Sequence, residues 1–490
     1  MRLRDLLDEA AGAAGGDVEI SGLAYDNRRV APGTLFFAVP GFTHDGHDFA
    51  PAAVAAGAAA LVVTRRLDGL EVPQVVVADV RAAMAAAAAR FCGDPTAQLP
   101  VVGITGTNGK TTTAFLVRAL LEAAGRPCGL LGTVKSVVGG EELPVERTTP
   151  EAIDLQPIFR AMLDAGDTAC AMEASSHALE LRRVDGIRFA AAVFTNLTQD
   201  HLDFHPTMEA YFEAKHRLFA GTPAPPGVRI VNVDDAYGRR LADEYPDAVT
   251  FGLAAPGDYG ALALRTGLAG SEFTLRTPEG RFEGVRSPLP GRFNVLNVLG
   301  AVAAVRALGV DLETIVGALA GAGRVPGRFE PVDAGQDFAV LVDYAHTPDS
   351  LENVLLAARD LATEGGGRLI SVFGCGGDRD RGKRPVMGAI SARLADHTIV
   401  TSDNPRSEPP ERIVAEILTG IGPRPDDGVE SDVDRRRAIA RAVALAGPGD
   451  VVVIAGKGHE QGQELANGRK EPFDDVTVAR EALRDAVRAA

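Results

Sequence analysis

The sequence has little positive charge and few cysteines. Its 490 residues include 50 Lys and Arg against 66 Asp and Glu, a formal net charge of −16. Nucleic-acid backbones are bound mainly through an excess of Lys and Arg, so this balance argues against a nucleic-acid-binding surface. The four cysteines lie far apart without metal-ligand spacing, and a chain of this length needs no disulfides to hold its core. We therefore expect a protein of the reducing cytoplasm.

The sequence also lacks a long apolar run. The alanine-rich stretch 82–89 is far shorter than the roughly 20 residues that a membrane-spanning helix needs. Asp5, Asp8 and Glu9 interrupt any signal-like apolar segment near the first residue. Membrane insertion is therefore not expected. Because 490 residues are too many for one hydrophobic core, about three domains are expected.

A third absence concerns the strict phosphate-loop pattern G-x-x-x-x-G-K-[ST]. In the stretch Val-Val-Gly-Ile-Thr-Gly-Thr-Asn-Gly-Lys-Thr, Ile104 stands where the first glycine belongs. The context is still that of a phosphate loop, because an apolar strand precedes the Gly-Lys-Thr and an apolar-periodic helix follows it. Gly106 and Gly109 let backbone N–H groups approach phosphate oxygens, while Lys110 can reach the terminal phosphates. Thr111 suits Mg²⁺, so we predict nucleotide binding, with a purely structural glycine turn as the alternative.

Polar side chains follow two further apolar strands. The strand 169–172 ends at Glu173, and the strand 190–194 leads to Asp200 and His201. Ligands of open parallel α/β sheets bind beyond the carboxyl ends of the strands, so these ends are expected to meet the phosphate loop at one crevice. Their oxygens and imidazole are suitable ligands near a Mg²⁺-nucleotide. Taken singly, each residue also fits a solvated acid or a hydrogen-bonded histidine.

Two segments rich in Pro and Gly divide the chain. Residues 93–96 resemble a linker, and residues 324–331 place Pro and Gly at both ends of an Arg-containing turn. We predict an α/β protein with three domains, at 1–98, 99–326 and 327–490.

The last predicted domain repeats the strand-end pattern. Four apolar strands there each lead to polar or glycine-rich residues, at 340–342, 369–373, 398–401 and 451–454. Helical segments separate them, so a second doubly wound, Rossmann-like sheet is the economical fold. Its glycine-rich loops lack G-x-G-x-x-G after a first strand, which argues against a dinucleotide-dependent oxidoreductase.

Three features stay open on residue patterns alone. The polar loops 26–30 and 41–48 of the first domain fit exposed turns or a ligand site. Lys215 lies on a helical stretch, where an exposed lysine is the default interpretation. Asn294 and Asn297 open another helix and fit cap or surface residues.

Five motifs together resemble the Mur ligase family, and the resemblance covers almost the whole chain. They are Gly-Thr-Asn-Gly-Lys-Thr at 106–111, Glu-Ala-Ser-Ser-His at 173–177, Thr-Asn-Leu-x-x-Asp-His-Leu-Asp at 195–203, Asp-Tyr-Ala-His-x-Pro at 343–348 and Gly-Lys-Gly-His-Glu at 456–460. A further motif at 403–406, Asp-Asn-Pro-Arg, is similar to that of the members that add diaminopimelate. The resemblance implies a small α/β N-terminal domain for a uridine nucleotide, a central ATPase domain with a P-loop-type parallel sheet, and a C-terminal domain that receives an amino acid.

The resemblance also implies roles for single residues. The catalytic set would be Lys110, Glu173, His201 and Lys215. ATP would be bound by Gly106, Thr107, Asn108, Gly109, Lys110, Thr111, Thr112, Asn294, Asn297, Arg328 and Asp343. The uridine nucleotide would be bound by Tyr25, Asn27, Thr43, His44, Thr148, Thr149, Ser175 and Arg183. Diaminopimelate would be bound by Arg379, Asp403, Asn404, Pro405, Arg406, Gly456 and Glu460. Asn27 replaces a usual Ser and Leu181 replaces a Gln of some members, which affects the contacts expected there.

Lys215 aligns with a family lysine that carries a carbamate derived from CO₂. An ammonium cannot ligate a cation, whereas a carbamate supplies an oxygen anion. The resemblance therefore implies a Mg²⁺ ion held by Thr111, Glu173, His201 and a carbamylated Lys215.

The implied activity is ATP-dependent ligation of a carboxylate to an amine in peptidoglycan precursor synthesis. The substrates would be ATP, UDP-N-acetylmuramoyl-L-alanyl-D-glutamate and meso-2,6-diaminopimelate, joined through an acyl phosphate. The alternatives are a lysine-adding sibling, a folylpolyglutamate-type ligase, and a nucleotide-binding regulator without ligase activity. Arg406 and the N-terminal loops count against both sibling ligases, and the metal and carbamate set counts against a regulator.

Overall fold

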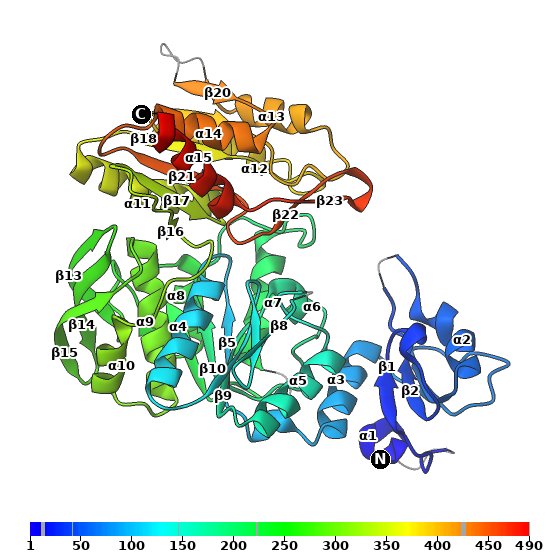
Figure 1. The fold of residues 1–490 in the computed structure, drawn as a ribbon. Coiled ribbons are helices and arrows are strands. Elements are labelled where there is room, and N and C mark those ends of the chain that lie inside the picture. The colour runs from blue at the N-terminus through cyan, green and yellow to red at the C-terminus, as the bar shows by residue number, and fades with distance from the viewer. Residues whose placement is uncertain (11–14, 42, 146, 222–223, 423–427, 490) are drawn as a thin grey trace. The chain divides into compact units, whose positions relative to one another are not determined.

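The computed structural model describes residues 1–10, 15–41, 43–145, 147–221, 224–422 and 428–489 (Figure 1). These residues form two compact units. The first contains residues 1–105, 125–193 and 213–229, and the second contains residues 106–124, 194–212 and 230–490. Among the described residues, no helix is both long and apolar enough to cross a membrane.

The first unit begins with a four-stranded parallel sheet in the order β1-β2-β3-β4. Its elements are β1 (Gly22–Ala24), β2 (Thr34–Phe37), β3 (Ala58–Val63), β4 (Gln74–Val76), α1 (Leu3–Leu6), α2 (Ala50–Ala55) and α3 (Val80–Phe91). Side chains of a strand alternate between the two faces of a sheet. Leu35 and Phe37 therefore pack with α1 and α3, while Phe36 packs with α2 on the opposite face.

The same unit holds six neighbouring strands in the order β10-β5-β9-β6-β7-β8. They are β5 (Val101–Thr105), β6 (Cys128–Leu131), β7 (Ser136–Val138), β8 (Glu141–Leu143), β9 (Ala169–Glu173) and β10 (Phe189–Phe194), with α5 (Ala152–Ala165) and α6 (Ser176–Glu180). Every residue of β5 and β9 is buried, as expected of strands covered on both faces. The predicted parallel sheet is confirmed for β5, β9 and β6, while β7 and β8 pair antiparallel at one edge.

The second unit contains α4, the strand pair β11–β12, a three-stranded meander and the C-terminal sheet. Its first elements are α4 (Lys110–Ala123), β11 (Val228–Asn232), α8 (Ala236–Glu244), β12 (Val249–Phe251), β13 (Gly260–Gly267), β14 (Gly270–Thr277), β15 (Gly280–Ser287), α9 (Arg292–Ala307) and α10 (Leu312–Leu319). Strands β11 and β12 pair in parallel, whereas β13, β14 and β15 form an antiparallel meander. Helix α9 is buried along most of its length, and it packs against α4, the helix that follows the phosphate loop.

The C-terminal sheet has the order β16-β17-β21-β18-β19-β20, with all pairs parallel except β16–β17. Its strands are β16 (Glu330–Pro331), β17 (Ala339–Asp343), β18 (Leu369–Phe373), β19 (His397–Val400), β20 (Val429–Ser431) and β21 (Val451–Ala455), followed by the hairpin β22 (Gly462–Glu464) and β23 (Lys470–Pro472). Its helices are α11 (Pro348–Gly365), α12 (Lys383–Leu394), α13 (Pro410–Leu418), α14 (Arg435–Leu445) and α15 (Asp475–Ala489).

Helices cover both faces of this C-terminal sheet. Helices α11, α12 and α13 pack on one face, and α14 and α15 pack on the other (Figure 1). Alternate residues of one strand enter the two cores, since Val340 and Val342 face α14 and α15 while Leu341 faces α11. The predicted doubly wound, Rossmann-like sheet is thus confirmed.

Two segments taken for loops have regular structure. Residues 27–29 form one turn of 3-10 helix between β1 and β2. In the predicted linker, Pro95–Ala97 is a second such turn, and buried Thr96 accepts a hydrogen bond from the backbone N–H of Arg188 at 3.0 Å. The predicted domain boundaries at 98 and 326 stay predictions.

Candidate active site

The phosphate loop joins β5 to α4 through two glycines with positive φ. A Cβ atom at Gly106 (φ +148°) would lie 3.0 Å from the backbone of Asn196 and much closer to the Thr195 hydroxyl, and one at Gly109 (φ +86°) would collide with Asn297. Side chains are thus excluded on steric as well as conformational grounds. The Lys110 Nζ donates hydrogen bonds to the loop carbonyls of Gly106 and Thr107, at 2.9 and 2.8 Å. The loop has the form that the sequence predicts.

The residues that follow β10 brace this loop. The backbone N–H of Thr107 donates to the carbonyl of Asn196 at 2.9 Å, and the Thr195 hydroxyl donates to the carbonyl of Asn108 at 2.6 Å. Asn108 also donates from its side chain to Asp349, in the first turn of α11, at 2.6 Å. Asp349 was not among the expected site residues, because a helix N-terminal acid is unremarkable in a sequence.

Two of the expected ATP contacts lie beside the loop. Arg328 Nη2 donates to the Thr111 hydroxyl at 3.1 Å, and its guanidinium stacks over the ring of Tyr344 at 4.4 Å. Asn297 accepts a hydrogen bond from Thr113 on α4, at 3.4 Å, and donates to Asn294 at 3.2 Å. Both asparagines are buried, so they are not surface residues.

Asp343 has a different environment from the one expected of a ribose contact. Its two carboxylate oxygens accept the backbone N–H groups of Phe329 and Ala345, at 2.6 and 2.7 Å. Burial raises its pKa to about 6 against the lowering effect of Arg328 and these two hydrogen bonds. In this structure Asp343 fastens the turn at 327–329 to the end of β17, and ribose binding stays a prediction.

Asp200 lies among three groups that can carry positive charge. Its Oδ2 is 3.4 Å from Nε2 of His201 and 3.9 Å from Nε2 of His346. Burial by itself would raise the pKa of Asp200, but His201, His346 and Lys383 outweigh burial and lower it to about 2. The pKa of His346 is lowered by burial and by Lys383. Motif reasoning singled out neither Lys383 nor a role for His346.

The predicted metal ligands are distributed over both units. Glu173 and Lys215 belong to the first unit, while Thr111 and His201 belong to the second. Lys215 lies on α7 (Met208–Ala220) and is only 1% exposed, which rules out the default interpretation of an exposed lysine. No group of three or more His, Cys, Asp or Glu side chains with metal-binding geometry occurs within the part of the chain that the structure describes.

Glu173 nevertheless suits a hard cation. It is almost fully buried at the end of β9, and its two oxygens accept hydrogen bonds from the N–H and hydroxyl of Thr133, at 2.8 and 3.1 Å. A Cβ atom at Gly132 would lie 2.5 Å from Glu173 Oε1, so only glycine leaves space beside that oxygen. A buried carboxylate offers the kind of oxygen ligand that Mg²⁺ prefers.

The first unit brings several predicted nucleotide-substrate residues together. The Thr149 hydroxyl donates to the carbonyl of Glu173 at 2.8 Å and accepts the backbone N–H of Ser175 at 3.3 Å. Thr148 and Thr133 share a hydrogen bond of 3.1 Å between their hydroxyls. Thr149 thus contacts the backbone of Glu173, and Thr148 contacts the threonine that holds its carboxylate. Binding of the uridine nucleotide by these residues stays a prediction. Asn27 lies in the turn after β1, and Thr43 and His44 are exposed beyond β2.

Next to them lies a group that we call the Glu151 cluster: Glu151, Arg81, Arg147 and Arg183. Glu151 Oε1 is 3.0 Å from Arg147 and 2.9 Å from Arg183, and its Oε2 is 3.2 Å from Arg81. One buried carboxylate thus faces three guanidinium groups, which leaves a formal charge of +2. Tyr25 lies in the electrostatic range of this cluster. Of the cluster, the sequence pointed only to Arg183.

The carboxyl ends of β19 and β21 form a second charged group, the Lys457 cluster: Lys457, Asp403, Asn404 and Glu460. Lys457 is fully buried, and its Nζ lies 2.9 Å from Asn404 Oδ1, 2.9 Å from Glu460 and 3.5 Å from Asp403. Asn404 also donates to Glu460 at 2.8 Å. Lys457 belongs to a motif that the sequence revealed but was not chosen as a site residue.

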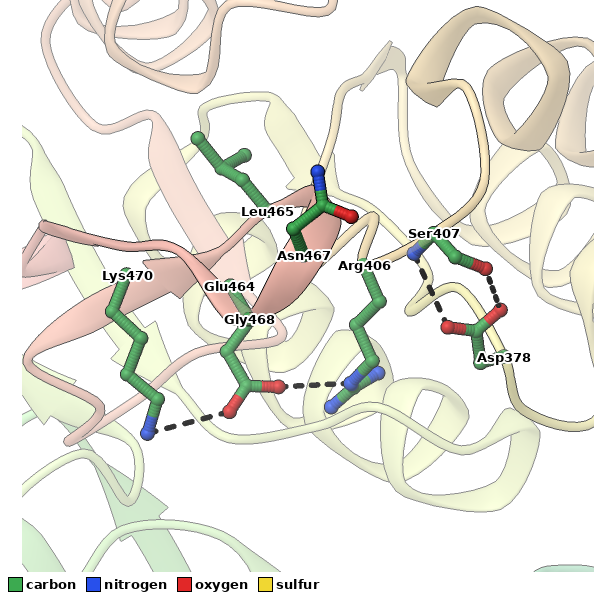
Figure 2. Close-up of a pocket in the computed structure, with 8 residues that line it drawn as sticks. All are labelled: Asp378, Arg406, Ser407, Glu464, Leu465, Asn467, Gly468 and Lys470. Atoms are coloured by element: carbon green, nitrogen blue, oxygen red, sulfur yellow. Dashed lines mark hydrogen bonds and ion pairs between the residues drawn. The ribbon is translucent and has the colours of Figure 1, made fainter.

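Arg406 lines a cavity of about 290 Å³ with Asp378, Ser407, Glu464, Leu465, Asn467, Gly468 and Lys470 (Figure 2). It adopts φ +51°, a backbone conformation that is unfavourable for a residue other than glycine and recurs at functional sites. Its guanidinium points into this pocket from the turn after Pro405, which is buried. Arg379 is exposed and donates to the carbonyl of Asp378 at 3.3 Å.

Comparison with known proteins assigns the chain to a family. Three family models match it: "Mur ligase family, catalytic domain" at 19–92, "Mur ligase middle domain" at 104–305, and "Mur ligase, glutamate ligase domain" at 327–458. A curated relative from Geobacter sulfurreducens is 48% identical, and the alignment covers 99% of each chain. The chain belongs to the Mur ligase family.

The relatives of this Mur ligase have specific names. The Geobacter sulfurreducens protein and one from Streptomyces coelicolor are both called UDP-N-acetylmuramoyl-L-alanyl-D-glutamate--2,6-diaminopimelate ligase. The second is 48% identical, with 98% of this chain and 96% of that protein covered. A solved structure of an enzyme of the same name is 35% identical and matches with a TM-score of 0.71 over 99% of each chain. The three-domain Mur ligase architecture is therefore confirmed.

Proposed function

We propose that this Mur ligase uses ATP to join meso-2,6-diaminopimelate to the D-glutamate of UDP-N-acetylmuramoyl-L-alanyl-D-glutamate, in peptidoglycan precursor synthesis. The observation that carries the proposal is Arg406, whose guanidinium lines a pocket beyond the carboxyl end of β19. Diaminopimelate differs from lysine by one carboxylate at the far end, and a guanidinium is a planar fork matched to that group. Full-length relatives named for this reaction support the assignment.

The reaction that follows has two steps. The D-glutamyl side-chain carboxylate attacks the γ-phosphorus of ATP, which releases ADP and leaves an acyl phosphate. The amine of diaminopimelate then attacks the acyl carbon, and the tetrahedral intermediate expels inorganic phosphate as the amine loses its proton. ATP is needed because a carboxylate becomes a useful electrophile only when an oxygen has been turned into a leaving group.

The loop at 106–111 is suited to the first step. Its backbone N–H groups and the N-terminus of α4 bind phosphate oxygens, and Lys110 exchanges its two carbonyl acceptors for them. Arg328, hydrogen-bonded to Thr111, brings a second cation to the same place. Fixed positive charge around the transferring phosphoryl group is the main source of catalysis in such a step.

Mg²⁺ would be held by Thr111, Glu173, His201 and a carbamylated Lys215. When bound, the ion supplies Lewis-acid stabilisation of the phosphate charge. The burial of Lys215 and of the Glu173 carboxylate supports this set. We place the reaction in the cytoplasm, where ATP is present and the four free thiols stay reduced.

The remaining charges suit the other two substrates. The Glu151 cluster, with its excess of guanidinium groups, suits the diphosphate and carboxylates of the uridine nucleotide. The Lys457 cluster, where Asp403 and Glu460 outnumber one lysine, suits an ammonium group of the amino acid.

An amino-acid panel tests the proposal. Purified protein is given ATP, Mg²⁺ and the uridine-nucleotide dipeptide with meso-diaminopimelate, lysine, glutamate or no amino acid, and phosphate release and product mass are measured. We expect turnover with diaminopimelate and loss of turnover in Lys110→Ala. Preference for lysine would indicate the lysine-adding sibling, and preference for glutamate would indicate a folate-type ligase. Nucleotide binding without turnover on any amino acid would indicate a regulator.

A further inference from the structure

The guanidinium of Arg406 already has a carboxylate partner within the chain. Its Nε donates to Glu464 Oε2 at 2.8 Å, and its Nη1 donates to the carbonyl of Gly377 at 2.9 Å (Figure 2). A carboxylate binds a guanidinium best through two parallel N–H bonds. Because Glu464 holds Nε, a ligand carboxylate cannot occupy the edge formed by Nε and Nη2 while Glu464 stays in place.

The backbone of Glu464 is anchored independently of its carboxylate. Strand β22 runs beside the 403–406 motif, where the N–H of Arg406 donates to the carbonyl of Glu464 at 3.1 Å. The N–H of Glu464 donates to Asn404 Oδ1 at 2.9 Å, and the Gln463 amide donates to the carbonyl of Asp403 at 2.6 Å. The side chain of Glu464 can therefore turn away from Arg406 without releasing the hairpin.

A second cation is available to Glu464 when it leaves. Lys470, on the returning strand β23, lies 3.4 Å from Glu464 Oε1, and Figure 2 shows the two cations on opposite sides of the carboxylate. Burial would raise the pKa of Glu464, but Arg406 and Lys470 hold it below its usual value, so the group is an anion at neutral pH. A ligand carboxylate can thus take the place of the Glu464 carboxylate on Arg406, and the displaced Glu464 keeps Lys470 as its partner.

We infer that Glu464 is a specificity-determining residue, an internal carboxylate that the distal carboxylate of the amino-acid substrate replaces on Arg406. The inference rests on the proposed function. A diaminopimelate carboxylate that takes the Nε edge of Arg406 displaces Glu464, so Glu464 weakens its binding. Lysine has no distal carboxylate to exchange, and its distal ammonium meets an Arg406 whose charge Glu464 neutralises. Glu464 therefore makes the preference for diaminopimelate over lysine smaller than Arg406 alone would make it.

The decisive variant is Glu464→Gln, which keeps a hydrogen-bond acceptor for Arg406 and removes the charge. The matched control is Glu471→Gln, which neutralises an exposed carboxylate of the same hairpin that pairs with Arg469. The steady-state kcat and KM for meso-diaminopimelate and for lysine are measured with ATP and the nucleotide substrate saturating. A partly exposed ion pair contributes up to about 1 kcal/mol, so KM for diaminopimelate should fall about threefold to fivefold. The kcat/KM for lysine should fall, and Glu471→Gln should change neither.

A second variant has the opposite expected sign. Lys470→Gln removes the cation that Glu464 keeps as its partner on leaving Arg406, so KM for diaminopimelate should rise, by about twofold, while kcat/KM for lysine stays constant. A purely structural role for the hairpin would move KM in the same direction in both variants. An unchanged or raised KM for diaminopimelate in Glu464→Gln, with an active wild type, overturns the inference alone. A wild type that does not use diaminopimelate overturns the proposed function and this inference with it.

Discussion

The Glu151 and Lys457 clusters have opposite charge balances. In the Glu151 cluster one carboxylate is shared by three guanidinium groups, whereas in the Lys457 cluster one ammonium is shared by two carboxylates and an amide. The side chains of the three arginines range from 16% to 51% exposed, but that of Lys457 is fully buried. The excess positive charge of the first cluster is thus partly exposed to water, while in the second cluster the ammonium is buried between two carboxylates that outnumber it.

This difference in charge and burial indicates how each cluster would recognise its substrate. An exposed cationic surplus attracts any polyanion and gains affinity from net charge. A buried ammonium held by three partners offers only defined positions, so this cluster discriminates by geometry and by the cost of leaving a group unpaired. We expect the first region to set affinity for the nucleotide and the second to set the choice of amino acid.

The largest expected effect lies in neither cluster. Lys215→Ala should lower kcat by on the order of 10³-fold or more, because it removes a proposed oxygen ligand of the metal. Short-chain carboxylic acids added to this variant should restore part of the activity, since a diffusible carboxylate replaces the missing oxygens. Lys135→Ala, which removes a lysine paired with Glu142, is the control. Full activity of Lys215→Ala would refute the carbamate role.

Arg406→Ala should change only the choice of amino acid, without the general loss of kcat expected of Lys215→Ala. Sites built around a polar partner reject analogues that lack it by on the order of 10⁴-fold, so wild type should strongly prefer diaminopimelate over lysine. The variant should lose most of that preference, with KM for the nucleotide unchanged. Arg412→Ala removes a surface arginine that pairs with Glu416 and serves as control. If Arg406→Ala keeps the full preference, the assignment of Arg406 is wrong.

Arg183→Ala should act on the other substrate. Two guanidinium groups remain on Glu151, so the fold should tolerate the change. Loss of one charge-assisted contact corresponds to about a tenfold rise in KM for the nucleotide, with KM for diaminopimelate unchanged. Arg160→Ala, which removes a partly exposed arginine of α5 paired with Asp164, should change neither. A rise in both KM values would contradict the division between the two regions.

Ionic strength should affect the KM values of the two substrates differently, by a few-fold. Raising salt from about 0.05 M to about 0.5 M shortens the Debye length from roughly 14 Å to roughly 4 Å. KM for the nucleotide should rise by about twofold to fourfold, because the Glu151 cluster is partly exposed, while KM for diaminopimelate changes less. Equal salt dependence of both constants, with ATP saturating, would remove the distinction.

The smallest effect concerns acid stability in the C-terminal region. Glu408 and Glu416 bind the fully buried Arg384, at 2.8 and 2.6 Å. Hydrogen bonds from Arg384 to Glu408, and from Arg381 and Arg384 to Glu416, lower both pKa values to about 2. A lowered pKa means that the stabilisation is complete above the ordinary value of 4.5 and is lost as pH falls toward 2.

Glu408→Gln tests this pair by thermal unfolding at several pH values. At pH 7 it should cost about 1 kcal/mol, and its difference from wild type should shrink as pH falls from about 4.5 to about 2. Glu411→Gln, at an exposed position on α13, should follow wild type throughout. If the difference in stability between Glu408→Gln and wild type stays constant with pH, the charge of Glu408 is not what stabilises the fold.

The sequence predicted the strands that are buried on both faces. Strands such as β5, β18 and β21 are continuous runs of apolar residues, and their ends carry the motifs, so both signals are local. The meander β13–β15 was not anticipated, because its burial alternates irregularly with solvent exposure and its pairing, not its composition, defines it. The antiparallel edge at β7 and β8 escaped notice for the same reason.

The site could be predicted only where its chemistry lies in a contiguous motif. The Gly-Lys-Thr loop is such a case, and Arg328 beside Thr111 came from the family resemblance. Glu151 contacts Arg81 across 70 positions, and no local pattern encodes that pair. The burial of Lys457 and the pairing of Arg406 with Glu464 depend on how separate strands and a hairpin converge, which composition does not specify.

The hydrogen bond between Asn108 and Asp349 connects the phosphate loop directly to helix α11 of the C-terminal domain. Asn108 belongs to the loop proposed to hold ATP, and Asp349 belongs to the first turn of α11. A nucleotide that reorients Asn108 changes this 2.6 Å bond, and a shift of α11 changes the loop that the nucleotide meets. The coupling is reciprocal in free energy. If bound ATP favours one position of α11, then holding α11 in that position strengthens ATP binding by the same free energy.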